Sequence, residues 1–205
     1  MIRLVLAAIV LLGSAVSSWA DVIDFEIGSL FLNPGQTGSL EGFNFTNSAG
    51  ASAFIVVPVT ADSCSPLCVS NGTKTMGLFN DASVTLAPIV GGTFAASAFD
   101  VAGTFTDSTR NITSLEVIGN LFGGGQVTET FAVNPNAFQT FSLLPSFTNL
   151  TSLEFLGLLP AGDYSPEFQL DNIVVGSAVP EPGSVILLAT LVVFLGSTLR
   201  RRLTA

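Results

Sequence analysis

The chain of 205 residues contains no histidine, and it has one tryptophan and one tyrosine. Histidine is the usual general base near neutral pH and the commonest metal ligand, so its absence removes the simplest routes to catalysis and to zinc binding. Phenylalanine supplies most of the aromatic side chains, with 17 residues. Because its ring carries no polar group, this composition indicates rings that fill a core.

Basic residues are also scarce. Between residues 21 and 178 the chain carries fourteen Asp or Glu residues but only Lys74 and Arg110, which gives this region a net charge near −12. Binding to nucleic acid depends on Lys and Arg side chains that displace counterions from phosphates. We therefore expect no nucleic-acid partner, and a cation is better matched to this charge.

The first twenty residues have the pattern of a secretory signal peptide. Arg3 provides a positive start, Leu4 to Leu12 form a short apolar stretch, and Ser18-Trp19-Ala20 is a small-x-small cleavage site. The alternative is a permanent N-terminal membrane helix, but the apolar stretch is short and polar residues follow it at once. Residues 1–20 are thus predicted to be removed, and the body to be exported.

Cys64 and Cys68 are the only cysteines of the chain. An even number of cysteines in an exported protein favours a disulfide, here closing a small loop that contains Pro66. A redox CxxC motif would have two intervening residues instead of three, and a zinc site would need further ligands nearby. The sequence therefore predicts a structural disulfide.

Apolar residues of the body, residues 21–178, occur in short runs that alternate with polar residues. This period of two is typical of strands with one buried face, and turn-forming residues separate the runs. The sequence therefore predicts an all-β fold, an antiparallel β-sandwich of jelly-roll type. Thr93–Phe105 is expected either to split at Gly103 or to carry a bulge. The expected strands are Val22–Ile27, Ala53–Val59, Thr75–Phe79, Ser83–Ile89, Thr93–Phe105, Ser114–Leu121, Gln126–Val133, Phe138–Leu143, Ser152–Leu159 and Phe168–Val175.

The chain ends with an apolar stretch followed by arginines. Val185 to Leu199 is nearly all apolar, and counted from Gly183 the stretch has 17 residues, near the lower limit for crossing a bilayer. Arg200, Arg201 and Arg202 follow directly, as the positive-inside rule expects of a cytoplasmic end. The alternative is a buried strand or core helix, but the arginines favour one C-terminal transmembrane helix.

The residues just before this stretch carry a resemblance to a known family. Pro180-Glu181-Pro182, a glycine, the apolar helix and the arginine cluster together resemble the PEP-CTERM sorting signal of exported bacterial proteins. In that family exosortase, a membrane-embedded cysteine protease or transpeptidase, recognises and processes the segment in bacteria that make exopolysaccharide. The resemblance covers residues 179–202, with residues 203–205 as a tail. It implies exosortase and the membrane as partners.

The sequence FQLDNIVV near the end of the body carries a second resemblance. It is similar to the closing strand of many PEP-CTERM proteins and of some jelly-roll carbohydrate-binding modules, which often hold a structural calcium between an early strand and the last one. The resemblance implies Asp24, Glu26 and Asp171 as oxygen ligands of one Ca²⁺. The alternative is that these acids face water at a sheet edge, where they oppose aggregation.

Ligand contacts and catalytic residues have weaker signals. Sugar sites usually stack sugar rings on Trp or Tyr, and Tyr164 is the tyrosine available as a ligand contact. Asp163 with Glu167, and Asp24 with Glu26, are carboxylate pairs of the kind that hydrolyse glycosides, but acidic surfaces contain such pairs routinely. Phosphate-binding, nucleophile-elbow and metalloprotease signatures are absent. We expect no enzyme.

Together these features predict an exported, non-enzymatic surface or extracellular-matrix protein that is sorted by exosortase. Its body would be adhesive or structural in an extracellular polysaccharide layer. The alternative is a calcium-supported carbohydrate-binding module that acts on that polysaccharide. The expected location is a membrane-anchored precursor, followed by the cell surface, outer membrane or matrix of a Gram-negative-type bacterium.

Overall fold

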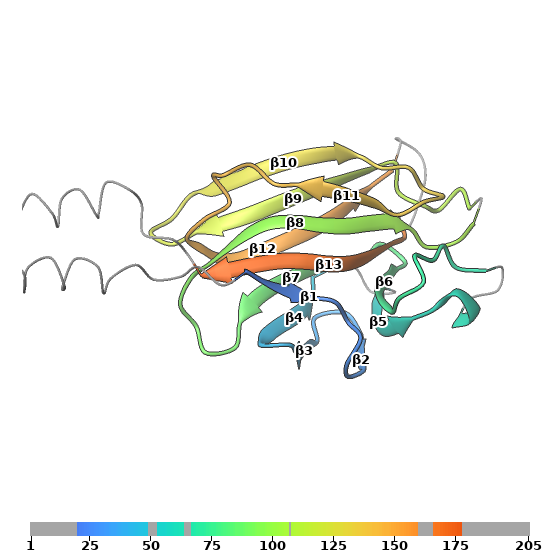
Figure 1. Cartoon of the computed structure of the whole chain (residues 1–205), viewed down its shortest axis with the longest axis horizontal. Coiled ribbons are helices and arrows are strands. Elements are labelled where there is room, and N and C mark those ends of the chain that lie inside the picture. The colour runs from blue at the N-terminus through green and yellow to red at the C-terminus, as the bar shows by residue number, and fades with distance from the viewer. Residues whose placement is uncertain (1–19, 49–52, 64–66, 107, 160–165, 178–205) are drawn as a thin grey trace, which may run out of the picture. The chain divides into compact units, whose positions relative to one another are not determined.

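The computed structural model describes residues 20–48, 53–63, 67–106, 108–159 and 166–177. All strands of these ranges lie in one of two compact units of the chain, Trp19–Ala178, whereas the other unit, Met1–Ser18 with Val179–Ala205, falls outside the described residues. One short 3₁₀ helix is present, η1 (Ala61–Ser63) (Figure 1). The strands are β1 (Ala20–Ile23), β2 (Leu30–Leu32), β3 (Thr37–Leu40), β4 (Phe43–Asn47), β5 (Phe54–Val59), β6 (Thr75–Phe79), β7 (Ser83–Pro88), β8 (Phe94–Gly103), β9 (Ser114–Leu121), β10 (Gln126–Ala132), β11 (Gln139–Ser142), β12 (Leu150–Leu158) and β13 (Phe168–Ser177).

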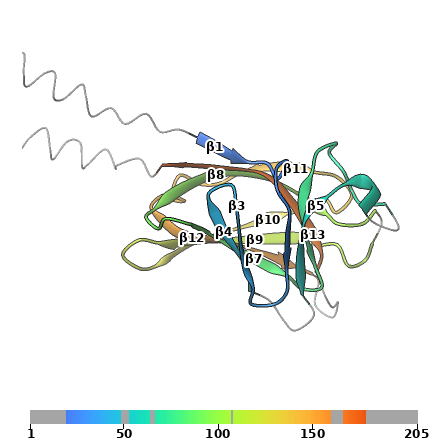
Figure 2. The ribbon, with the colours of Figure 1, turned by 90° about the horizontal axis from the view of Figure 1, so that it is seen from below.

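The strands pair antiparallel and form two layers (Figure 2). Sheet I has the order β2-β5-β6-β13-β8-β11, with β1 beside the second half of β13. Sheet II has the order β3-β4-β7-β12-β9-β10. A single pair, Leu150 with Phe94, links β12 to β8. The chain passes repeatedly from one sheet to the other, as it does in jelly-roll sandwiches.

The alternation of apolar and polar residues decides which face of each strand is buried. In β9, Leu115 and Val117 are fully buried, while Glu116 between them is half-buried. Phe99 of β8 packs edge-to-face on Phe155 of β12, with ring centroids 5.1 Å apart. The two sheets therefore share one aromatic core.

The prediction of an all-β antiparallel sandwich is confirmed. The ten predicted strands correspond to β1 and β5 to β13, and β6 and β9 have the predicted bounds. Strand β1 is displaced from the predicted Val22–Ile27 and ends at Ile23, because Phe25 has a positive φ of 57° that extended backbone does not allow. Strand β8 ends at Gly103, and its pairing with β13 shifts between Ala98 and Ala96.

Strands β2, β3 and β4 were not predicted. They have three to five residues each, and strands this short give a weak periodic signal, although β6 with five residues was predicted. Gly38 of β3 approaches β2 so closely that a Cβ atom at this position would lie 2.2 Å from Leu30 Cδ1. A larger residue at this position would require the Leu30 side chain to shift.

Within the described ranges, no helix has the length and apolarity needed to cross a membrane. The predicted C-terminal transmembrane helix and residues 1–19 of the predicted signal peptide fall outside these ranges, so both stay predictions. Ala20, the last residue of the predicted signal peptide, begins β1. The same holds for the sorting motif at Pro180, Glu181 and Pro182 and for the arginine cluster at its end.

Candidate functional site

Strand β13 carries Asp171 and Asn172 at a β-bulge. The register against β8 shifts after Asp171, so that β13 has one extra residue, and Asn172 adopts a positive φ of 47°. Asn tolerates this backbone conformation better than most residues. The bulge places the two polar side chains on the outer side of sheet I, while Leu170 and Ile173 stay buried in the core.

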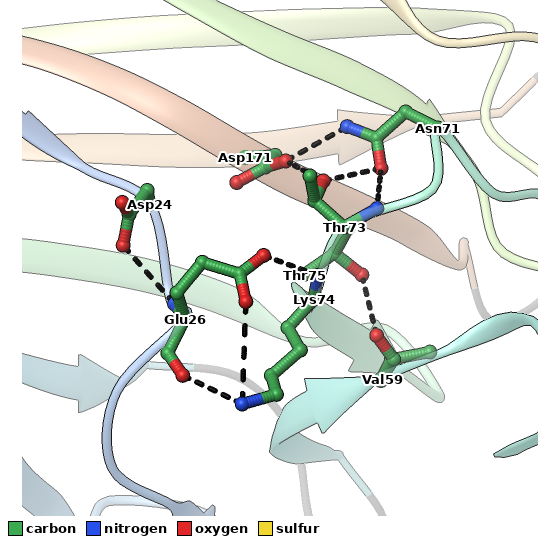
Figure 3. Close-up of polar contacts among 8 residues, drawn as sticks. All are labelled: Asp24, Glu26, Val59, Asn71, Thr73, Lys74, Thr75 and Asp171. Atoms are coloured by element: carbon green, nitrogen blue, oxygen red, sulfur yellow. Dashed lines mark hydrogen bonds and ion pairs between the residues drawn. The ribbon is translucent and has the colours of Figure 1, made fainter.

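Asp171 is only 1% exposed, and its carboxylate accepts hydrogen bonds from three residues. Asn71 Nδ2 and Thr73 Oγ1 donate to Oδ2 at 2.7 and 2.8 Å (Figure 3). The N–H of Asn172 donates to Oδ1 at 2.8 Å. Burial raises the pKa of Asp171 above its ordinary value; the hydrogen bonds oppose this rise, and the nearby Asp100 carboxylate adds to it. The carboxylate thus fastens the loop before β6 to the last strand.

Asp100 of β8 extends these contacts across sheet I. Asn172 Nδ2 donates to Asp100 Oδ2 at 2.8 Å and to Asp171 Oδ2 at 3.4 Å, so one amide bridges the two carboxylates. Thr140 of β11 donates to Asp100 Oδ1 at 2.6 Å. The shared N–H groups reduce the repulsion between the two acids. We call the six residues the Asp171 network: Asn71, Thr73, Asp100, Thr140, Asp171 and Asn172.

Asp24 and Glu26, the other two predicted calcium ligands, contact protein groups as well. Lys74 donates its N–H to Glu26 Oε1 at 2.9 Å, and its Nζ donates to the Glu26 carbonyl at 2.6 Å. Asp24 Oδ1 accepts the N–H of Glu26 at 3.1 Å. In Figure 3, Glu26 faces Lys74, whereas Asp171 faces Asn71 and the loop around it. Glu26 and Asp171 therefore hold the segment before β6 from two sides, and Asp24 contacts the N–H of Glu26.

In the part of the chain that the structure describes, no group of three or more acidic, histidine or cysteine side chains could hold a metal ion. The predicted set of Asp24, Glu26 and Asp171 is therefore not assembled as one cluster. Each of the three carboxylates instead accepts N–H or O–H groups of the protein. A cation at Asp171 would have to displace these donors. Calcium binding at this position stays a prediction.

Glu167 is a buried acid whose role differs from the predicted one. Its side chain is 2% exposed and forms an ion pair with Arg110, which also donates to Asn80. Burial raises the pKa of Glu167, and the Arg110 charge opposes that rise. Its N–H donates to the Arg110 carbonyl at 2.9 Å. Glu167 therefore ties the loop before β9 to β13, and its predicted partner Asp163 lies outside the described residues.

Cys68 belongs to a small apolar cluster on the outer side of sheet I, together with Val59 and Phe79. It is 4% exposed and is not a free cysteine. Its predicted disulfide partner, Cys64, lies outside the described residues, so the pairing stays a prediction. Phe79 stacks on Phe54 of β5, with ring centroids 4.8 Å apart. Tyr164, the predicted ligand contact, also lies outside the described ranges.

Sequence reasoning found Asp171 but missed its partners. The contact with Asn71 spans 100 residues of sequence, and the contact between Asn172 and Asp100 spans 72. Nothing local in the sequence identifies such a pair. The one usable signal was the Asn-Gly-Thr turn at residues 71–73, which marks a polar loop but not its partner.

No known protein family matches the chain, and no curated protein matches it. Several solved structures are similar at low identity. A family 29 carbohydrate-binding module from Piromyces equi shares 9% identity over 79% of this chain and 92% of that one, with a TM-score of 0.41. An F5/8 type C domain from Bacteroides fragilis shares 12% identity over 72% and 100%, with a TM-score of 0.41. A carbohydrate-binding module in complex with β-1,4-galactotriose shares 12% identity over 65% and 86%, with a TM-score of 0.37. Similarities this distant assign no ligand and no activity to this chain.

Proposed function

We propose that the chain is an exported bacterial surface protein that exosortase sorts through a PEP-CTERM signal. The observation that carries the proposal is the three-part tail at residues 179–202. Pro180 and Pro182 exclude regular helix around Glu181, which keeps an extended peptide accessible to a protease. The apolar helix behind it holds this peptide at a fixed height above the membrane, and the arginines stop the chain from being pulled through.

The sorting proposal is tested by replacing Pro180, Glu181 and Pro182 together with alanine in a host that contains exosortase. We expect an uncut precursor that stays in the membrane fraction, because without the two prolines the peptide around Glu181 can become helical. Intact-mass measurement of wild type and variant reports both processing events. The matched control is Pro34→Ala in the turn before β3, which should be trimmed like the wild type. Normal C-terminal trimming of the triple variant would refute the proposal.

For the body we propose non-catalytic binding to extracellular polysaccharide. Hydrolysis of a glycoside needs two carboxyl groups that face each other with space for the substrate or for water. The acids of the Asp171 network instead share the amide of Asn172, which contacts Asp100 and Asp171 at the same time. Glu167 is paired with Arg110. This use of carboxylates in the scaffold favours binding over cleavage.

Retention on the host's own exopolysaccharide tests this second proposal. The protein is incubated with the polymer, sedimented, and the supernatant is assayed for new reducing ends. We expect retention without any increase in reducing ends, and no retention of heat-unfolded protein. New reducing ends would overturn the non-catalytic assignment, and a protein that stays in the supernatant would overturn binding.

A further inference from the structure

The outer face of sheet II carries a row of side chains, one from each strand. Thr85 lies between Val84 and Leu86, which are both fully buried, so its side chain points away from the core. Thr46 and Glu154 alternate with buried neighbours in the same way. The strand register places the members of this polar row side by side, in the order Thr37, Thr46, Thr85, Glu154, Ile118 and Thr128.

Neighbouring polar side chains on this face are hydrogen-bonded to one another. Each hydroxyl can donate one hydrogen bond and accept two, so such a pair fixes both side chains and leaves capacity toward solvent. These side chains are already held in place, so they lose less conformational entropy when a ligand binds than unpaired side chains would. The pairs are Thr37 with Thr46 (2.8 Å), Ser39 with Asn44 (2.7 Å), Ser48 with Thr85 (3.1 Å), Ser83 with Glu154 (3.2 Å) and Asn120 with Ser152 (2.8 Å).

The outer face of sheet I is less available. Asn71 and Thr73 of the loop before β6 are bound to Asp171 there. The cluster of Cys68 and Phe79 covers a further part of the same face. The members of the polar row, in contrast, are all half-buried or exposed. Sheet II therefore presents the more accessible surface.

The charge of the body selects the kind of polymer that fits. The body has a net charge near −12, and its two basic residues are paired with acids, Lys74 with Glu26 and Arg110 with Glu167. A polysaccharide that carries carboxylates or sulfates would be repelled. Neutral sugars present hydroxyl groups, which donate to Glu154 and exchange hydrogen bonds with the threonines.

The dimensions of the polar row suit an extended chain of sugars. Adjacent strands lie about 4.8 Å apart, so a row across six strands is roughly 24 Å long. Ile118 and Leu156 are half-buried on the same face and offer apolar contacts to the C–H faces of sugar rings. The surface thus combines polar and apolar groups over a length of several sugar units.

We propose that the polar row is the surface on which the body binds an extended, neutral polysaccharide. This inference rests on the proposed function, because it names the surface and the polymer class for binding by the body.

The test compares the full chain, solubilised in mild detergent, with three variants. Thr46→Val with Thr85→Val removes two hydroxyls from the centre of the row with little change in shape, and Thr128→Val removes one from its exposed end. Ser142→Ala on β11 is the control, because Ser142 is exposed on the outer face of sheet I and lies outside the Asp171 network. Affinity electrophoresis uses galactomannan and hydroxyethyl cellulose as neutral probes, alginate as the acidic probe, and the host's own polysaccharide.

We expect the wild type and Ser142→Ala to bind a neutral probe equally. The double variant should bind about tenfold more weakly and Thr128→Val about threefold more weakly, as the loss of one or two neutral hydrogen bonds implies. Thermal unfolding shows that each variant is folded. Unchanged binding by both row variants would overturn the polar row but leave polysaccharide binding in place. Preference for alginate would overturn the neutral class, and a wild type that binds none of the four polymers would contradict the proposed function itself.

Discussion

Asp171→Asn tests how the closing strand is held to the loop before β6, because it keeps the shape of the side chain and removes its charge. In the wild type the two carboxylate oxygens accept hydrogen bonds from Asn71, Thr73 and Asn172. An asparagine has one oxygen and one NH₂ group, so its NH₂ must face at least one of these donors. In the variant, the NH₂ group of the asparagine therefore faces an N–H or O–H donor of a neighbouring residue, at a position that is 1% exposed.

The expected cost follows from these contacts. A buried donor that loses its acceptor costs about 1–3 kcal/mol, and a hydrogen bond to a charged acceptor contributes about 1.5–3 kcal/mol. Removal of a buried charge offsets part of this loss, since burial raises the pKa of Asp171. We expect a destabilisation of about 2 kcal/mol at neutral pH, which for a unit of this size lowers the Tm by about 4–8 °C.

The pH dependence of the same variant has a defined sign. The folded-state pKa of Asp171 is raised, so protonation of its carboxyl group adds stability beyond the hydrogen bonds of the charged form. This added stability is fully present below the ordinary pKa of an aspartate and is lost as the pH rises through the raised value. The asparagine variant does not titrate at this position. The difference in stability between wild type and variant should therefore widen as the pH falls through this window.

Urea-induced unfolding, followed by circular dichroism at several pH values, measures both effects. The matched control is Asp81→Asn in the exposed turn between β6 and β7, where Asn tolerates the positive φ of 70° and no change in stability is expected. An Asp171→Asn variant as stable as the wild type at neutral pH would refute the hydrogen-bond argument. A difference that narrows on acidification would refute the argument from burial.

Three further predictions concern neighbouring groups. Gln169→Leu removes a buried side chain whose Oε1 accepts from Thr75 at 2.6 Å, and should cost about 3 kcal/mol in urea unfolding; adding Thr75→Val should recover part of this loss in a double-mutant cycle. Arg110→Met leaves the Glu167 carboxylate buried without its cation and should lower the free energy of unfolding by about 2 kcal/mol. This cost is smaller than for a fully buried pair because Arg110 is half-exposed, and it should be much smaller when Glu167→Gln is already present. Calcium binding at Asp171 predicts a Tm that is higher in calcium than in EDTA for the wild type but equal in both for Asp171→Asn; equal values in the wild type would rule this site out.

The longer strands with one buried face were the easiest part of the fold to predict. Strand β9 is the clearest case, since Leu115 and Val117 enter the core while Glu116 and Ile118 do not. The prediction failed around β2 to β4, where the strands are short and Gly38 of β3 contributes no side chain to the apolar pattern. A glycine within a strand has no side chain, so it weakens the alternation of apolar and polar residues from which strands are predicted.

The site was predictable only in part, because its acids have partners distant in sequence. The letters LDNI predicted a closing strand, which β13 confirms, and singled out Asp171, whose role as a calcium ligand stays a prediction. Whether a carboxylate meets a cation or a protein N–H depends on which loop lies over it, and Asn71 comes from a loop 100 residues earlier. The polar row of sheet II has the same character, because it exists only through the register of six strands.

The arrangement of β1 and β13 bears on how both proposed cuts could leave the body intact. Strand β1 begins at Ala20, the residue before the predicted signal-peptide cut, and Ala20 is paired with Gly176 at the end of β13. The PEP residues begin at Pro180, only three residues beyond Ser177. The signal-peptide cut would remove Ala20 from β1 and leave the pairs of Asp21, Val22 and Ile23 with β13 in place. Neither cut removes a residue from β13, which β6 and β8 also hold within sheet I. The mature protein would keep the Asp171 network and the polar row complete, so release from the membrane need not change what the body binds.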